Sequence, residues 1–396
     1  MPMRPCWVEI SVRSLEDNYR FLTSLAAGEA ELLAVVKADA YGHSLELCAP
    51  AAVRAGARWL GVTSVEEGVE ARAMCPEARV LVMSGVFPGQ YPAVVEHGLT
   101  AVVWEPWHLD ELEGAAGAAG DGPGSLPVHL EIDTGMSRQG VGADGLDAVL
   151  ARIGARSPLR LEGVMTHLFA ADESEGRITE EQLARLDEAL RRVEAAGLHP
   201  EWLNVGNSAA LLAGEAGRIE ALAQRWGLKT MLRPGLALYG VAPQFEPRFE
   251  LDKEPEGVAA ARARLQPVLS WKTRVVGVRT VPSGAVVGYN GTFVATEPMR
   301  LALLAVGYAD GLDRRLGNRF SLLVRGERAP LVGRISMDQA VLDVTEIDNV
   351  EAGDEVVILG RQGDEAITAF DHAEAAETIP WEVFTRIGAR IQRVAV

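Results

Sequence analysis

One lysine stands where its side chain could act as a nucleophile. In the run LLAVVKADAYGH, Lys37 follows five apolar residues, Leu32–Val36, which predict a buried strand that ends at this lysine. A buried amine is costly to keep charged, so its pKa falls and it becomes available as a nucleophile or for a Schiff base. The alternative is a lysine whose charged end simply reaches solvent from the end of a strand.

Polar side chains also follow other predicted strands. They are Arg138, His167, Asn207, Ser208 and Arg233, the last accompanied by Gly235. All would lie at the carboxyl ends of parallel strands, where barrel enzymes build their active sites. The loops after the last two strands resemble the phosphate cradle of such barrels. A lysine nucleophile, a phosphate site and an imidazole in one barrel mouth together favour pyridoxal 5'-phosphate as cofactor.

Short apolar runs alternate with helix-like segments from about residue 30 to 240. The predicted strands are Leu32–Lys37, Trp59–Thr63, Arg79–Met83, Thr100–Trp104, Val128–Asp133, Leu159–His167, Trp202–Val205 and Met231–Arg233. This alternation predicts an α/β fold, a (β/α)8 TIM-like barrel, with an open doubly wound sheet as the alternative. The segment Thr179–Ala196 has a helical stripe, and Thr179 with Gln182 fits a capping box. Residues Glu113–Gly124, of low complexity, predict a solvated loop.

The pattern changes after Gly240. Residues 243–265 carry prolines and charges with little periodicity and predict a connection between domains. The short apolar runs beyond it predict a mainly antiparallel β-domain. These runs are Val275–Val281, Met299–Val306, Arg319–Val324, Ala340–Val344 and Glu355–Leu359. We therefore expect a barrel over residues 1–242, whose first residues are candidates to pack on the β-domain, and a β-domain over 243–396.

Composition excludes several classes of function. The net charge of −17 argues against a general affinity for nucleic acid or anionic lipid. The longest uncharged run, Thr280–Thr296, contains a proline and several glycines, which is unlike a membrane span. The three cysteines lie far apart, and neither a CxxC nor an HExxH motif occurs, so no metal site is expected. With no secretory h-region either, we expect a cytoplasmic enzyme.

Motifs along nearly the whole chain resemble those of bacterial alanine racemases. AVVKADAYGH at residues 34–43 is similar to the family's cofactor-lysine signature. Further matches are IDTGMSRQG at 132–140, THLFAAD at 166–172, NSAA at 207–210, RPGLALYG at 233–240, VGYNGTF at 287–293, VGYADG at 306–311 and GRISMDQ at 333–339. The resemblance implies a pyridoxal-phosphate enzyme that interconverts L- and D-alanine for peptidoglycan. It also implies a homodimer whose active sites each combine one barrel with the partner's β-domain.

The resemblance implies a role for each matching residue. Lys37 would hold the cofactor and act as one base, and Tyr289 of the partner subunit would act as the base on the opposite face. Arg138 and the backbone N–H of the partner's Met337 would bind the substrate carboxylate. The remaining cofactor contacts would come from Tyr41, His167, Ser208, Arg233, Gly235, Leu236 and Trp381.

Two further residues match with a weaker assignment. Tyr308 would narrow the entrance from the partner's side, and Asp338 would support the same network. Ordinary domain packing is the alternative for both.

Three positions depart from the family pattern. Glu131 stands where the family usually has a lysine, often carbamylated, and Asn204 stands where a histidine usually backs the arginine at the pyridine. Trp381 stands where a tyrosine is usual. We expect Glu131 to bond to Arg138, with pairing to another barrel residue as the alternative.

The sequence leaves other functions open besides the racemisation of alanine. One is a racemase of broader or shifted specificity, such as for serine. Another is a non-catalytic pyridoxal-phosphate carrier with a barrel alone, against which the β-domain and its Tyr289 argue. A barrel decarboxylase is disfavoured because its HVGS and triple-glycine signatures are not found.

Overall fold

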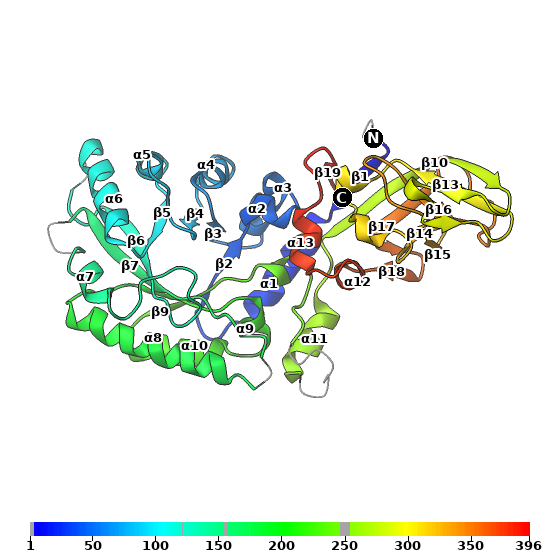
Figure 1. Cartoon of the computed structure of the whole chain (residues 1–396). Helices are drawn as coiled ribbons and strands as arrows, with labels where there is room; N and C mark the ends of the chain where they lie inside the picture. Colours follow the sequence, from blue (N-terminus) through cyan, green and yellow to red (C-terminus); the bar gives the residue numbers. More distant parts are fainter. Residues whose placement is uncertain (1–3, 121, 154–156, 174, 246–253) are drawn as a thin grey trace. The chain divides into compact units, whose positions relative to one another are not determined.

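The computed structural model describes residues 4–120, 122–153, 157–173, 175–245 and 254–396, in two compact units. The first, here called the barrel unit, comprises Arg13–Ala40 and Cys48–Gln266. The second, the sheet unit, comprises Met1–Val12, Tyr41–Leu47 and Pro267–Val396. Figure 1 shows the helices and strands of both units along the chain.

The barrel unit is built on eight parallel strands. They are β2 Glu31–Val35, β3 Trp59–Val62, β4 Arg79–Val82, β5 Thr100–Val103, β6 Leu126–Glu131, β7 Leu159–Met165, β8 Trp202–Asn204 and β9 Lys229–Leu232. Each pairs with the next in parallel, and β9 pairs with β2 through Glu31↔Met231 and Leu32↔Leu232. This last pairing closes the ring, so the predicted barrel is confirmed and the open sheet is excluded.

Helices and short helical turns precede or follow the strands of the barrel. They are α1 Val12–Leu25, α2 Lys37–Tyr41, α3 Leu45–Arg54, α4 Val65–Met74, α5 Tyr91–Glu96, α6 Pro106–Ala119, α7 Leu146–Leu150, α8 Arg177–Ala195, α9 Ser208–Leu212, α10 Ala216–Arg225, η1 Leu236–Tyr239 and α11 Glu256–Arg264. In α8 the buried residues Leu186, Leu190 and Val193 recur at the spacing of one helical face. This face explains why the helix lies against the barrel.

Two local predictions in this unit are wrong, and a third segment contains a helix that was not predicted. Helix α8 begins after Gly176, so Thr179 is not its N-cap, and the buried Gln182 side chain bonds to Thr134 instead. Helix α6 continues through the first part of the predicted loop at Glu113–Gly124, because its alanines favour helix. The connection at 243–265 contains helix α11 among its described residues.

The sheet unit is mainly antiparallel, as predicted. Its strands are β1 Cys6–Ile10, β10 Leu269–Val281, β11 Val286–Val287, β12 Phe293–Val294, β13 Met299–Leu304, β14 Ser321–Val324, β15 Glu327–Pro330, β16 Ala340–Asp343, β17 Glu355–Gln362, β18 Glu365–Ile367 and β19 Gln392–Ala395. Two helices, α12 Ala369–Ala375 and α13 Pro380–Thr385, and the short turns η3 Tyr289–Gly291, η4 Tyr308–Asp310 and η5 Arg314–Leu316 complete it. The first half of β10 alternates buried and half-buried residues, the pattern of a strand with one face in a core.

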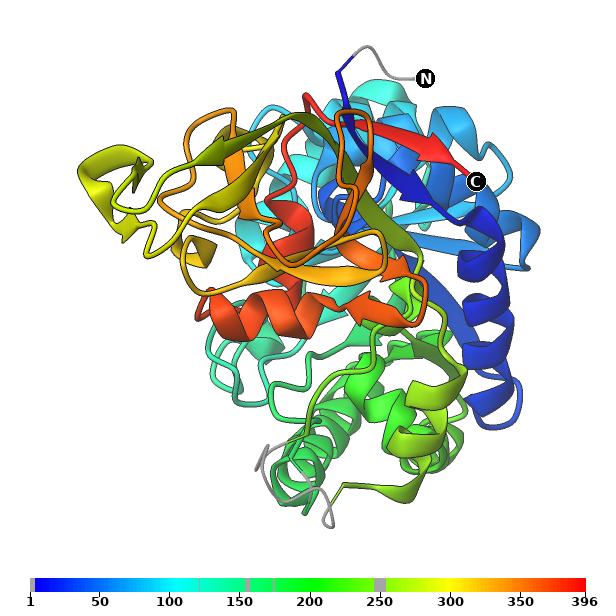
Figure 2. The ribbon, with the colours of Figure 1, turned by 90° about the vertical axis from the view of Figure 1, so that its right-hand side faces the viewer.

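Both ends of the chain contribute to this sheet. Strand β1 pairs with β10 in antiparallel and with β19 in parallel, and Figure 2 shows the blue β1 beside the red β19. The buried Trp271 of β10 donates a hydrogen bond from Nε1 to Cys6 Sγ at 3.3 Å. The amino-terminal strand is therefore part of the core of the sheet unit.

Candidate active site

Lys37 does not end a strand, as the sequence suggested, but begins a left-handed turn. Strand β2 ends at Val35, and the four residues Ala38–Tyr41 all have φ between +51° and +55°. Such a run is unfavourable for residues with a Cβ, by about 1–2 kcal/mol each. Tertiary hydrogen bonds must therefore hold the turn in place.

Glu67 supplies part of that support. Its Oε1 accepts the backbone N–H of Asp39 at 3.1 Å, and its Oε2 accepts that of Thr63 at 3.3 Å. The backbone N–H of Glu67 in turn donates to Ser64 Oγ, the N-cap of α4. The start of α4 thus fixes the turn that follows Lys37.

The amine of Lys37 lies in a positively charged environment. Burial is the largest cause that lowers its pKa, followed by the charge of Arg138; Glu67 acts in the opposite direction, and Arg233 lowers the pKa further. Lys37 is half-buried and Arg138 is exposed. An amine with a lowered pKa has a larger neutral fraction, as a nucleophile or base requires.

Arg233 is buried at the end of β9 and held from two sides. Its Nη1 donates to Asn204 Oδ1 at 2.5 Å and to the Asn204 carbonyl oxygen at 2.6 Å. Its Nη2 donates to the Thr166 carbonyl oxygen at 2.8 Å. Asn204 therefore backs Arg233 directly, although the family's usual histidine is absent there. Burial lowers the pKa of Arg233 to about 10, so the side chain stays a cation at neutral pH.

His167 lies beside this guanidinium. Its Nδ1 is 3.4 Å from Arg233 Nη2, and because arginine only donates, this nitrogen is the acceptor. Burial and the charges of Arg233, Arg138 and Lys37 lower the pKa of His167 to about 3. The ring is therefore neutral and offers a flat face rather than a charge.

Backbone N–H groups gather around Ser208 at the start of α9. Ser208 Oγ accepts the N–H of Gly235 at 3.0 Å and that of Ala237 at 3.1 Å. Ser208 and Leu236 are both buried. The loops after β8 and β9 are thus tied together by one hydroxyl, and they bring Ser208, Gly235 and Leu236 to one place.

Glu131 is buried but is not bonded as expected. Gln139 Nε2 donates a hydrogen bond to Glu131 Oε2, whereas no hydrogen bond or ion pair joins Glu131 to Arg138 among the described residues. Arg138 is exposed whereas Glu131 is buried, and the bond is made by the half-buried Gln139. Burial raises the pKa of Glu131, while Gln139, Arg233 and Arg138 oppose that rise.

The other six predicted site residues belong to the sheet unit. Tyr289 in η3, Tyr308 in η4 and Met337 have exposed fractions of 67%, 43% and 54%. Asp338 accepts a hydrogen bond from Arg390 Nη2 at 2.7 Å. Tyr41 is buried, with its pKa raised to about 12 by burial, and Trp381 in α13 is half-buried.

Two loops of this group are joined by the backbone. The N–H of Tyr308 donates to the Ser336 carbonyl oxygen and that of Ala309 to the Met337 carbonyl oxygen, each at 3.0 Å. Gly307 allows the approach, since a Cβ there would lie 2.3 Å from the oxygen of Ser336. Tyr308 and Met337 are therefore presented together.

Three polar residues at or behind the site, two of them buried, were not singled out from the sequence. They are His129 and Glu162, which lie inside strands β6 and β7, and Gln139. A signal was present for the first two, because a histidine and a glutamate interrupt otherwise apolar strands in VHLE and LRLEGVM.

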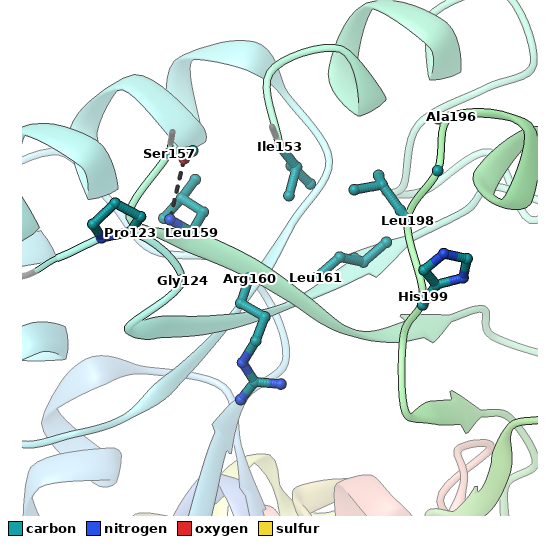
Figure 3. Close-up of a pocket in the computed structure, with 11 residues that line it drawn as sticks. Pro123, Gly124, Ile153, Ser157, Leu159, Arg160, Leu161, Ala196, Leu198 and His199 are labelled. Carbon is teal, nitrogen blue, oxygen red and sulfur yellow. Dashed lines mark hydrogen bonds between the residues drawn. The ribbon is translucent and has the colours of Figure 1, made fainter. Parts of the chain in front are cut away.

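A cavity elsewhere in the barrel unit does not include these residues. It has a volume of about 450 Å³ and is lined by the beginning of β7, Leu159–Leu161, and by residues 196–199 before β8 (Figure 3). These lining residues lie at the amino ends of β7 and β8. Lys37, Arg138 and Arg233 follow the carboxyl ends of strands, so the cavity lies at the opposite end of the barrel. It is not the candidate site.

Two kinds of feature are absent from the described residues. No group of three or more His, Cys, Asp or Glu side chains is arranged to hold a metal ion in that part of the chain. None of the helices described there is both long enough and apolar enough to span a bilayer.

Comparison with known proteins points to one family. The family model "Alanine racemase, N-terminal domain" matches residues 10–243, and "Alanine racemase, C-terminal domain" matches 268–395. An alanine racemase of Symbiobacterium thermophilum is 38% identical over 99% of this chain and 97% of its own length.

Solved structures agree with the sequence matches. The alanine racemase from D-cycloserine-producing Streptomyces lavendulae has a TM-score of 0.88 and 34% identity, and the match covers 100% of this chain and 98% of that one. The enzyme from Bartonella henselae, solved with covalently bound pyridoxal phosphate, has a TM-score of 0.81 and 27% identity, and the match covers 99% of each chain.

Proposed function

Since the chain belongs to the alanine racemase family and is an enzyme of that class, we propose that it interconverts L- and D-alanine with two bases, one on each face of the substrate. Lys37 is the first base, and Tyr289 of the partner subunit is the second. The proposal includes pyridoxal 5'-phosphate as cofactor, a homodimer with shared sites, and the supply of D-alanine for peptidoglycan.

One observation carries the proposal: the amine of Lys37 and the guanidinium groups of Arg138 and Arg233 share one site, where Arg233 Nη2 lies 3.4 Å from His167 Nδ1 and all three groups lower the pKa of that histidine. Among the described residues whose charges shift the pKa values of these groups, Glu131 is the only buried carboxylate. The carboxylate of Glu67 accepts a hydrogen bond from the turn that follows Lys37. Uncompensated cations favour anionic ligands. A phosphorylated cofactor and an amino-acid carboxylate fit this charge.

The residues present therefore fit pyridoxal phosphate. Lys37 would hold it covalently, and Arg233 would donate a hydrogen bond to its pyridine nitrogen, with the neutral ring of His167 against its face. The phosphate would be held by the hydroxyl groups and backbone N–H groups of Tyr41, Ser208, Gly235 and Leu236, with Trp381 nearby. When bound, the cofactor supplies the electron-withdrawing ring that makes the Cα–H bond of the substrate acidic.

The side chains of this protein do the proton transfer. Lys37 or Tyr289 of the partner subunit removes the Cα proton from one face, and the other group returns a proton to the opposite face. Arg138 and the N–H of the partner's Met337 hold the substrate carboxylate, so that Cα stays between the two bases. After each turnover the base that removed the proton is protonated and the other base is deprotonated. The first must lose a proton to solvent and the second must gain one before the next reaction in the same direction.

The test is an assay of racemisation with added pyridoxal phosphate on L-alanine, D-alanine, serine and leucine. Alanine should be converted in both directions, and Lys37→Ala should abolish conversion. Lys229→Ala is the matched control, because Lys229 is an exposed barrel lysine paired with Glu201 at 2.9 Å. Release of carbon dioxide, or no turnover of alanine by the parent protein, would overturn the proposal.

A further inference from the structure

His129 connects the buried side of Arg233 to a charged group deep in the barrel. It lies on β6 with no exposed surface, and its Nδ1 is 3.4 Å from Nδ2 of the equally buried Asn204. Asn204 Oδ1 accepts the bond from Arg233. On its other side, His129 Nε2 lies 3.7 Å from Oε2 of Glu162.

The donors and acceptors of this column can be arranged in only one way. Arginine only donates, so the amide oxygen of Asn204 must face Arg233 and the amide nitrogen must face His129. His129 Nδ1 is then an acceptor, and the proton of the neutral ring sits on Nε2, towards Glu162. A doubly protonated ring would place two donors against each other, and burial lowers the pKa of His129, which keeps it neutral.

Glu162 is a fixed negative charge at the far end. Arg79 donates to both of its oxygens, at 3.0 and 2.6 Å, and Arg160 donates at 2.9 Å. Burial alone would raise the pKa of Glu162, but the nearby His129, the hydrogen bonds and charge of Arg79, and the hydrogen bond of Arg160 outweigh it and hold the pKa at about 2. An ionised carboxylate therefore orients the imidazole dipole towards Arg233.

The strand beside His129 leaves room for its ring. Gly163 is its register partner on β7, and a Cβ at that position would lie 2.6 Å from His129 Cε1. Any other residue at position 163 would displace the imidazole. The glycine at position 163 therefore leaves space for the His129 ring, and this observation does not depend on the polar contacts of the ring.

We propose that His129 is a positioning residue that fixes the amide of Asn204, and through it the guanidinium that faces the pyridine nitrogen. The inference rests on the proposed function, since it assumes that Arg233 donates to the cofactor ring. His129 itself touches neither cofactor nor substrate. Its effect is to hold Asn204 Oδ1 towards Arg233, because the competing amide orientation would place two acceptors, Oδ1 and Nδ1, together.

The test compares two cofactors on the full-length protein without bound cofactor. One is pyridoxal 5'-phosphate, and the other is the 1-deaza analogue, in which a carbon replaces the pyridine nitrogen. Dissociation constants of both are measured by absorbance for the parent, His129→Phe and His129→Gln. Gln keeps an acceptor and a donor, whereas Phe keeps only the ring volume. His108→Phe is the matched control, since His108 is another buried neutral histidine, in α6.

The parent should prefer the natural cofactor, and His129→Phe should reduce this preference by about fivefold, the size expected for one weakened hydrogen bond. His129→Gln should retain most of it, and His108→Phe all of it. An unchanged preference in His129→Phe, or an equal loss of affinity for both cofactors, would overturn the inference. If His129→Phe does not fold, Gly163→Ala replaces it with the same expectation and the same contrary results. A parent protein that binds no cofactor at Lys37 would instead contradict the proposed function, and the inference with it.

Discussion

Gln139 Nε2 donates one hydrogen bond to the carboxylate of Glu131 and another, of 3.0 Å, to the carbonyl oxygen of Met83. The amide thus anchors a buried carboxylate whose charge is felt by Arg138 and Arg233. Glu131 therefore acts on Arg138 through space rather than through a direct bond. We propose that it supplies a carboxylate to the site without any lysine modification.

Replacing that charge should weaken substrate binding. In Glu131→Gln the amide can still accept from Gln139, but the negative charge beside Arg138 is lost. We expect the KM for alanine to rise by about threefold to tenfold with the cofactor still bound, as for a weakened charge-assisted contact. Steady-state kinetics in both directions and the cofactor absorbance measure this. Unchanged kinetics, or rescue of the variant by bicarbonate, would contradict the role.

The stability of the protein in acid should depend on Glu162. Its folded-state pKa of about 2 lies below the ordinary value of 4.5, so its contribution is complete above about pH 5 and is lost as the pH falls towards 2. The shift corresponds to a contribution on the order of 3 kcal/mol. Chemical denaturation of Glu162→Gln should give a lower free energy of unfolding at pH 7 and a flatter pH dependence between pH 5 and 2. Parallel curves for variant and parent would rule this out.

Loss of each base should affect the two enantiomers unequally. Lys37→Ala and Tyr289→Phe each remove the base from one face, so each should slow proton abstraction from one enantiomer more than from the other. Deuterium wash-in from heavy water into L- and D-alanine measures the two rates separately. Mixing the two inactive variants should also restore activity, because a mixed dimer contains one intact site. Equal losses in both directions, or no activity after subunit exchange, would argue against two bases from two chains.

Alanine should remain the preferred substrate because Trp381 is at least as large as the tyrosine usual at this position. Each added methylene in a tight pocket costs about 1–3 kcal/mol. Trp381→Ala should therefore raise kcat/KM for serine and leucine relative to alanine, whereas Trp381→Tyr should leave the order unchanged. Ile379→Ala is a suitable control, since Ile379 is an exposed apolar residue before the same helix. Comparable turnover of leucine by the parent protein would show that the pocket is not tight.

The strands were predictable because most of their residues are apolar and because helix-like segments separate them. Trp59–Val62 and Thr100–Val103, for example, were found from the sequence to within one residue at the carboxyl end. The parallel alternation then placed Arg138, His167 and Arg233 at one end of the barrel. That step needs only the direction of the strands and not their detailed packing.

Other features depend on contacts between distant residues and could not be predicted. The left-handed turn Ala38–Tyr41 has no glycine or asparagine signal, and a bond from Asp39 to Glu67 helps to hold it. Gln182, expected in a capping box, is instead used by Thr134 and by the Phe169 backbone. In each case a tertiary hydrogen bond overrides the local pattern.

The central claim is that Lys37 is the residue that carries the cofactor at this barrel mouth. The chain has only four lysines, Lys37, Lys229, Lys253 and Lys272, so a covalent label can be assigned without ambiguity. The most direct measurement is to load the protein with pyridoxal phosphate, reduce it with borohydride, and locate the label by peptide mass spectrometry. We predict a label on Lys37 alone, with loss of the absorbance band near about 420 nm that such a cofactor gives. A label on any other lysine, or none on Lys37, would contradict the account.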